Sequence, residues 1–324
     1  MKKNNLFISF TVLLFLIVNL SILRAQDPTF TQFYSNPMYL NPALAGSTGC
    51  PRFSLNYRNE WPSLSGNYVT YSAAYDYFAK NLNGGLGILA LHDRQGQGTI
   101  QTSMIGGFYS YHLKVDRKFT IMAGVRAAYF QKSLDWSQLT FGDMIDPRRG
   151  FIYQTGDVPR GGNKSFFDAS AGLVGFGKNY YFGLAAHHLT RPNESMILGD
   201  SRLPIRWTGH AGTTINIGKR GSFSNKTSIS PNIIYQYQNG FQELNIGTYV
   251  KHNVFTGGIW YRNNDAFIIL VGIATDKFKI GYSYDLTVSK LGNAITNGSH
   301  EISMGIFLKC RKPKQIRRIN CPSF

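Results

Sequence analysis

Hydrophobic positions alternate with small or polar ones along most of the chain after Arg52, in segments of about ten residues separated by turn residues. One segment shows this most clearly, with apolar side chains on one face and small or charged ones on the other: Phe119, Ile121, Ala123, Val125, Ala127 and Tyr129 against Thr120, Gly124, Arg126 and Lys132. A period of two excludes an amphipathic helix, whose apolar positions recur every three or four residues. Strands of about 9–11 residues are long enough to cross a bilayer. The pattern therefore predicts an all-β fold, a transmembrane antiparallel β-barrel.

The alternating segments predict about fourteen strands, an even number as single-chain bacterial barrels have. Their expected ranges are 52–59, 67–78, 84–92, 99–113, 118–132, 166–177, 179–188, 206–217, 226–237, 242–251, 253–261, 264–274, 277–285 and 299–308. The sheet should close, because unpaired backbone groups at an open edge are too costly in hydrocarbon. A soluble all-β sandwich or barrel is the alternative, and it leaves the lengths of the connections unexplained.

The connections differ in length in a regular way. Those after even-numbered strands are mostly short and polar, whereas those after odd-numbered strands include the long stretches 133–165, 189–205 and 286–298. Barrels of this class have short periplasmic turns and long outer loops. We therefore expect the three long stretches outside the cell and both chain ends in the periplasm. The stretch 133–165 is long enough to fold inward or to meet a partner, or it is a surface loop without fixed structure.

The first residues resemble an export signal. Lys2 and Lys3 precede an apolar run from Leu6 to Leu23, and a polar stretch starts after Ala25. This layout predicts a cleavable signal peptide over residues 1–25, with an uncleaved membrane anchor as the alternative. No run of 18 apolar residues occurs after this stretch, so the rest of the chain is not expected to contain a membrane-spanning helix. The expected location is therefore the outer membrane.

The chain is strongly basic, with a formal net charge of +17, and loss of residues 1–25 removes only three of its cations. The cations lie mostly at turns and within alternating strands, and do not cluster beside stacking aromatic residues, so nucleic acid is not an expected partner. Anionic lipid headgroups or acidic proteins fit better. Cys50, Cys310 and Cys321 lack the spacing of a zinc site. Because the first and last strands of a closed barrel pair, Cys50 and Cys310 belong at the same rim, and a disulfide between them, or between either and Cys321, is feasible.

No catalytic, cofactor or metal site is predicted. The chain has no nucleophile elbow and no HExxH motif, and the glycines at 84, 85 and 87 lack the Lys-Ser/Thr of a phosphate loop. Seven histidines are interpreted as strand-end or lumen residues: His92, His112, His187, His188, His210, His252 and His300. The predicted inward faces carry charges of both signs, which either line water or pair across the lumen: Arg52, Arg58, Arg126, Asp168, Arg206, His210, Glu243 and Glu301.

Residues 26–51 form a segment of their own before the first strand. Asn36-Pro37 and Asn41-Pro42 each remove a backbone donor and force an extended or turn conformation at the asparagine, so no regular helix or central strand is expected. The segment either plugs or underlies the periplasmic mouth, or it is a simple leader into the barrel. Its two Asn-Pro pairs are candidate partner-binding residues, together with Arg58 and Trp61 near the end of the first strand.

A basic tail follows the barrel predicted for residues 52–308. Residues 309–324 contain six cations and no acid, and we expect them in the periplasm. Arg311, Lys312, Arg317 and Arg318 are therefore candidate contacts to an acidic partner, with an affinity that falls as salt rises. A solvated end without a partner is the alternative.

Three stretches resemble the PorP/SprF family of outer-membrane barrels: residues 26–47 (QDPTFTQFYSNPMYLNPALAGS), 57–76 (YRNEWPSLSGNYVTYSAAYD) and 319–324 (INCPSF). The resemblance implies a component of the type IX secretion and gliding machinery of Bacteroidota. It implies three kinds of partner: outer-membrane lipid, a secreted surface protein with a C-terminal secretion domain, and periplasmic secretion or motility components. A porin or solute-uptake channel is the alternative function. A lipid-modifying membrane enzyme is a third, although no residue stands out for it.

Overall fold

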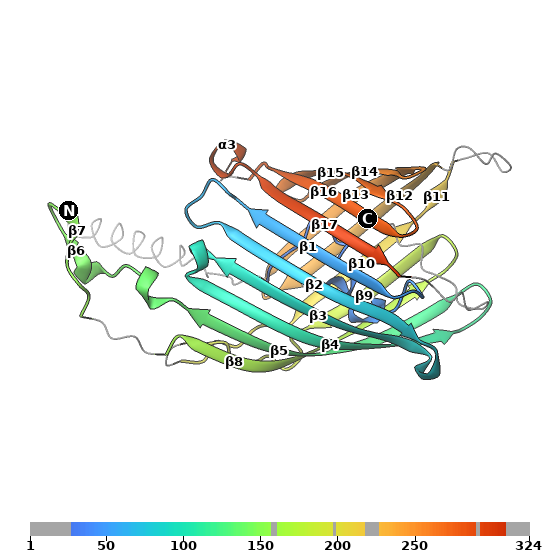
Figure 1. The fold of residues 1–324 in the computed structure, drawn as a ribbon, viewed down its shortest axis with the longest axis horizontal. Helices are drawn as coiled ribbons and strands as arrows, with labels where there is room; N and C mark the ends of the chain where they lie inside the picture. The colour runs from blue at the N-terminus through green and yellow to red at the C-terminus, as the bar shows by residue number, and fades with distance from the viewer. Residues whose placement is uncertain (1–26, 157–160, 197–198, 218–226, 290–291, 309–324) are drawn as a thin grey trace, which may run out of the picture.

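The strands form one closed antiparallel barrel (Figure 1). The structure, a computed structural model, describes residues 27–156, 161–196, 199–217, 227–289 and 292–308. Each strand pairs with its sequence neighbour along the wall, and pairing of the first strand with the last closes the circle. Fourteen strands therefore form the wall, as the alternation predicts.

The strand bounds lie within a few residues of those expected from the sequence. The wall consists of β1 (Arg52–Glu60), β2 (Tyr68–Ala79), β3 (Gly84–Gln95), β4 (Ile100–Lys114), β5 (Thr120–Leu134), β8 (Asn163–Phe176), β9 (Tyr180–His187), β10 (Arg206–Thr213) with β11 (Ile215–Asn216), β12 (Thr227–Gln238), β13 (Phe241–His252), β14 (Phe255–Arg262), β15 (Ala266–Ala274), β16 (Phe278–Thr287) and β17 (Ser299–Phe307). β10 and β11 count as one strand of the wall, because both pair with β12 in a single register, Arg206 opposite Gln238 and Ile215 opposite Ile229.

The two ends of the barrel differ. One end, the loop end, carries the connections 61–67, 135–162, 188–205 and 288–298, including α3 (Asn293–Thr296) and a small hairpin of β6 (Ile145–Asp146) and β7 (Gly150–Phe151). The other end, the turn end, carries the short connections 80–83, 115–119, 177–179, 253–254 and 275–277. The three longest connections thus lie at one end, as the sequence predicts, although this end also carries the short connections 96–99, 239–240 and 263–265, and the turn end carries the longer connection 217–226.

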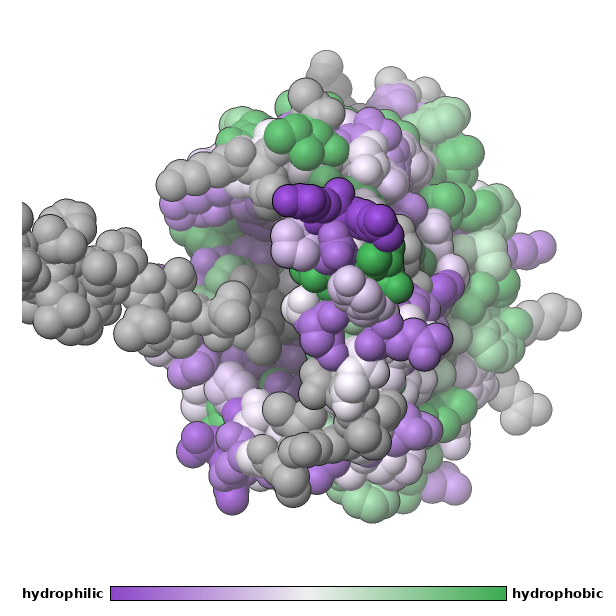
Figure 2. Space-filling view, turned by 90° about the vertical axis from the view of Figure 1, so that its left-hand side faces the viewer, coloured by the Kyte–Doolittle hydropathy of each residue, from purple (hydrophilic) through white to green (hydrophobic). Residues whose placement is uncertain are grey.

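Outward-facing positions of the wall are apolar. Along β15, Phe267, Ile269, Val271 and Ile273 are exposed, and β5 exposes Val125 and Tyr129 in the same alternation. An apolar exterior is what hydrocarbon requires of a barrel surface. Figure 2 looks onto the loop end and shows hydrophilic residues over the middle of this face and hydrophobic residues mainly along its right-hand side.

Two single helical turns precede the wall. They are α2 (Pro37–Leu40) and the 3₁₀ turn η1 (Pro42–Leu44), and both are buried. Among the described residues, no helix has the length and hydropathy needed to span a membrane.

Candidate functional site: the filled lumen

The segment before β1 lies inside the barrel and runs along the lumen from one end to the other. At the loop end, Asp27 contacts His188 and Arg206, which flank the connection between β9 and β10. At the turn end, the Gly46 backbone N–H donates to the Asp76 carboxylate at 2.8 Å, and Pro51 accepts from the Leu308 N–H at 3.0 Å. We refer to residues 27–51 as the lumen segment.

This course corrects two expectations from the sequence. The segment does not stop at or under the turn-end mouth, and it is not a simple leader, because most of its side chains are buried against the wall. The first described residue, Asp27, lies at the loop end, whereas the sequence placed both chain ends at the turn end. The reason is that the lumen wall offers both apolar surface and charged partners along its whole height.

Apolar packing fixes the middle of the lumen segment in two clusters. The first contains Phe33, Tyr34, Leu40 and Leu44 against Met122, Val174, Phe176, Tyr181, Ile234, Tyr249, Trp260, Ile268 and Leu270. The second contains Phe30, Met38 and Ala45 against Ala74, Leu89, Leu91, Met104, Phe108 and Ala128. Full burial of each large apolar side chain contributes roughly 1.5–3 kcal/mol relative to exposure. The lumen therefore has the character of a protein core and not of a water channel.

Glycines in the wall let the backbone of the lumen segment approach closely. A Cβ built on Gly124 of β5 would lie 2.4 Å from the Ala43 Cα, and one on Gly85 of β3 would lie 2.0 Å from the Ala45 carbonyl oxygen. Both distances are far shorter than a normal van der Waals contact. The wall and the segment thus fit each other at these two points without side chains between them.

The two Asn-Pro pairs shape the segment: Asn41 is extended and Asn36 is not helical, as the sequence predicts, and a single helical turn follows each. Each proline occupies the first turn of a short helix, a position where its missing N–H costs nothing. Asn41 caps the second turn, its side-chain oxygen accepting from the Ala43 N–H at 2.9 Å. Its amide nitrogen donates to the Leu184 carbonyl oxygen at 3.1 Å, and Asn36 donates to the Ser72 hydroxyl at 2.8 Å. Both asparagines therefore bind the wall and are buried.

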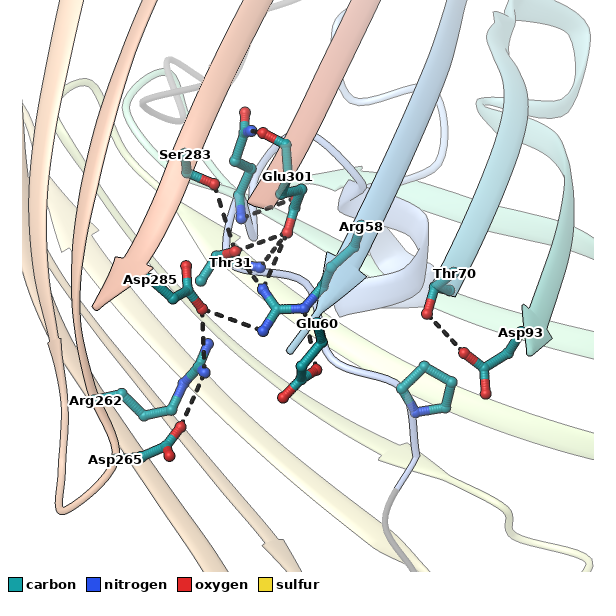
Figure 3. A network of polar contacts seen from close by, with 12 residues as sticks. Thr31, Arg58, Glu60, Thr70, Asp93, Arg262, Asp265, Ser283, Asp285 and Glu301 are labelled. Carbon is teal, nitrogen blue, oxygen red and sulfur yellow. Dashed lines mark hydrogen bonds and ion pairs between the residues drawn. The ribbon is translucent and has the colours of Figure 1, made fainter. Parts of the chain in front are cut away.

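Arg58 of β1 lies at the centre of a buried polar network (Figure 3). Its guanidinium pairs with Asp285 of β16 at 3.1 Å and with Glu301 of β17 at 3.4 Å, and it donates to the Thr31 hydroxyl. The Glu301 carboxylate also accepts from the backbone N–H groups of Thr31, at 2.6 Å, and Gln32, at 3.1 Å. These contacts tie the lumen segment to both the first and the last strand.

Asp27 anchors the segment at the loop end. Its carboxylate lies 2.8 Å from the His188 Nε2 and 3.2 Å from the Arg206 Nη1. Burial alone would raise the pKa of Asp27, but the charges of His188 and Arg206 outweigh it and hold this pKa well below its ordinary value. Burial alone would lower the pKa of His188, but Asp27 and Asp168 outweigh it and raise this pKa. Charged forms of both partners are therefore favoured.

Inward charges pair between nearby strands along the wall, and not across the lumen. Arg52 pairs with Asp76 at 2.9 Å, Arg126 with Asp168 at 2.7 Å, and Arg262 of β14 with Asp285 at 3.4 Å. A cavity of about 70 Å³ remains beside the segment near the loop end, lined among others by Asp27, Tyr39, Arg126, Phe130, His188 and Arg206. Such a volume holds a few water molecules.

The other candidate residues lie apart from this site. Trp61 follows β1 at the loop end and packs edge-on against Tyr68, with 5.7 Å between ring centroids, so it does not join Arg58 in the lumen. Cys50 is disulfide-bonded at the turn end. Cys310, Cys321, Arg311, Lys312, Arg317 and Arg318, the tail 309–324 and the expected signal peptide 1–25 all lie outside the described residues.

Sequence reasoning missed the roles of Asp27, Thr31 and Gln32, and it also missed the apolar lumen. One signal was available for the second feature. Residues 267–271 of β15 are an unbroken apolar run, Phe-Ile-Ile-Leu-Val, although only alternate side chains of a strand face lipid. Ile268 and Leu270, which face inward, are completely covered. The described residues contain no cluster of histidine, cysteine or carboxylate side chains that could hold a metal ion.

A closed fourteen-strand barrel with an apolar exterior and a polar loop end defines an outer-membrane β-barrel. This chain belongs to the PorP/SprF family, because the family model for the type IX secretion system membrane protein PorP/SprF matches residues 22–306. The resemblance seen in the sequence is therefore confirmed.

Several solved outer-membrane proteins are distantly similar. The Acinetobacter baumannii outer membrane protein Omp33 is 10% identical, with a TM-score of 0.43 over 81% of this chain and 100% of its own. A Pseudomonas aeruginosa FadL homologue is 11% identical, with a TM-score of 0.43 over 87% and 98%. The P. putida toluene transporter TodX is 11% identical, with a TM-score of 0.45 over 83% and 92%. No curated protein matches the chain.

Proposed function

We propose that this barrel is a non-enzymatic anchor of the type IX secretion system, which holds or helps export a surface protein with a C-terminal secretion domain and links it to periplasmic machinery. Family membership supports a role in this system. The observation that carries the rest is the lumen segment, because a barrel filled by its own chain is suited to hold partners at its two ends and not to pass solutes.

The alternative function, a porin or uptake channel, requires a water-filled path. Here the inward cations are matched by inward carboxylates, and Arg58, Asp285 and Glu301 are almost completely buried beneath the segment. In planar bilayers the purified full-length barrel should therefore show little or no ion conductance. Steady open-channel conductance in the unmodified protein would favour the porin.

Deletion of the gene tests the anchoring role in cells. We expect one or a few surface proteins with the C-terminal secretion domain to be released into the medium or left unexported, as measured by quantitative proteomics of cells and medium. Growth on individual solutes is the control and should not change. Normal surface display combined with a growth defect on one solute would contradict the proposal.

The basic tail is proposed to contact an acidic periplasmic component. Residues 309–324 hold six cations and no acid in the sequence. Truncation after Leu308 should leave an inserted barrel whose mobility on gels is still heat-dependent, but should weaken retention of periplasmic partners, most clearly at low salt, where the charges of the tail are least screened. Unchanged partner retention at every salt concentration would remove this role from the tail.

A further inference from the structure

The long connection at the loop end is an ordered arm that exposes apolar side chains. Residues 135–156 of this connection, here called the arm, project beyond the ends of the barrel strands and carry the β6–β7 hairpin (Figure 1). At the hairpin, Ile145, Phe151, Ile152 and Tyr153 are 47%, 61%, 49% and 53% exposed. Outward side chains of the wall are similarly exposed in the isolated barrel, but in the membrane lipid covers them. The arm extends beyond the wall along the barrel, so the lipid around the wall does not cover it.

Acidic side chains of the arm fix its conformation by accepting hydrogen bonds from other residues of the arm. Asp143 accepts from the Thr155 hydroxyl at 2.9 Å and the Gly156 N–H at 2.8 Å. Asp146 accepts from the backbone N–H groups of Arg148 and Arg149, at 2.8 and 2.9 Å, and from the Tyr153 hydroxyl at 3.0 Å. These bonds lower the pKa of both carboxyls, of which Asp143 is exposed and Asp146 is partly exposed. The arm therefore has a definite conformation although it packs against little else.

Arg148 and Arg149 at the hairpin turn are the two cations of the arm, whose three carboxylates, Asp135, Asp143 and Asp146, accept hydrogen bonds from the arm itself. Within the described residues their guanidinium groups have no ion pair, since Asp146 binds only their backbone. The tip of the arm thus presents apolar and cationic groups together. An interface with this composition fits a protein surface that carries acidic residues around an apolar patch, because aromatic side chains and arginine contribute most to binding at such contacts.

We propose that the arm is a docking element for the surface protein, which it binds through an acidic, partly apolar face outside the cell. This proposal rests on the proposed anchoring function and names the part of the barrel that carries it. Lipid headgroup phosphates could also attract the two arginines, but the direction of the arm, away from the lipid-facing wall, favours the protein.

Two paired variants of the full-length barrel test the proposal in cells. Phe151→Ser with Ile152→Ser removes the apolar contact, and Arg148→Gln with Arg149→Gln removes the charge. Each should release at least about tenfold more surface protein into the medium than the unmodified barrel, since loss of two buried apolar side chains or two charge contacts weakens binding by this order. Retention by the unmodified barrel should fall as salt rises, and the arginine variant should lose that salt dependence.

Matched controls use exposed residues of the same types at the same end. Ile295→Ser in α3 and Arg202→Gln, which are 60% and about 61% exposed, should leave retention unchanged. A photo-crosslinking residue at position 151, but not at 295, should form an adduct with the same surface protein that gene deletion releases. Heat-dependent gel mobility verifies that each variant is folded.

The outcomes separate the two proposals. If gene deletion releases no surface protein, the anchoring function is wrong. If deletion releases a protein that both arm variants retain, the anchoring function stands and the arm proposal is wrong. Crosslinks from position 151 to lipid alone would also overturn it, because the arm would then contact the membrane.

Discussion

Arg58 shows how much of this barrel depends on single buried charges. Its side chain is 2% exposed and pairs with Asp285 and Glu301, which are covered to the same extent. A buried pair adds little net stability over an apolar replacement, but removal of one partner leaves an uncompensated charge. The identity of residue 58 therefore matters more than the number of ion pairs around it.

Substitution of Arg58 by Gln should lower the free energy of unfolding by about 3–5 kcal/mol, because Glu301 then stays buried without a cation and Asp285 keeps only Arg262. Urea unfolding of the barrel in detergent, followed by tryptophan fluorescence, measures the change. Arg202→Gln is the control, since Arg202 and Asp200 are both about 60% exposed and such pairs contribute about 0–1 kcal/mol. Equal effects of the two substitutions would contradict the role of the network.

The strength of the ion pair between Asp27 and His188 should depend on pH. The raised pKa of His188 means that its contribution is complete below pH about 6.5 and is lost as pH rises through the higher pKa of the folded state. The lowered pKa of Asp27 means that its contribution is lost only in strong acid. Amide hydrogen exchange of residues 29–36, corrected for its intrinsic pH dependence, should therefore speed up toward alkaline pH. His188→Gln should abolish this response.

At the scale of elements, the fourteen strands followed from the sequence, whereas the position of the lumen segment did not. Alternation is a local pattern, so strands such as β13 can be placed to within about a residue. The bonds of Thr31 to Glu301 join residues 270 positions apart, and nothing local in either stretch specifies the other. Prolines 37 and 42 indicate an irregular segment, but not the wall against which it packs.

The fit between the lumen segment and the wall can be tested without deleting either. Gly124→Ala should displace residues around Ala43, because the new Cβ would lie 2.4 Å from the Ala43 backbone. Limited proteolysis should then cut the segment, and bilayer conductance should rise. Gly107→Ala on the adjacent strand β4 is the control, since a Cβ there meets nothing within 4 Å. The close fit is disproved if both variants are equally resistant.

Over the whole molecule, the difference between the two ends predicts its orientation. The end with the arm and the other long loops should face outward, and the end with the short turns should face the periplasm. An epitope inserted at 147–149 should be labelled by antibody on intact cells, whereas one at 115–117 should be labelled only after the outer membrane is opened. The reverse pattern would require the barrel to be inverted, and the docking proposal would fail with it.

The lumen segment also bears on the order of assembly. Thr31 and Gln32 bind Glu301 on β17, and Thr31 also binds Arg58 on β1, so these contacts span the seam where the first and last strands meet. Until the segment enters, the carboxylate of Glu301 lacks its backbone donors, and the apolar lumen wall faces water. The last step of insertion should therefore couple two events: the first and last strands pair while the lumen segment is already inside the barrel. A chain in which this segment is held outside the lumen should therefore pair its first and last strands less firmly.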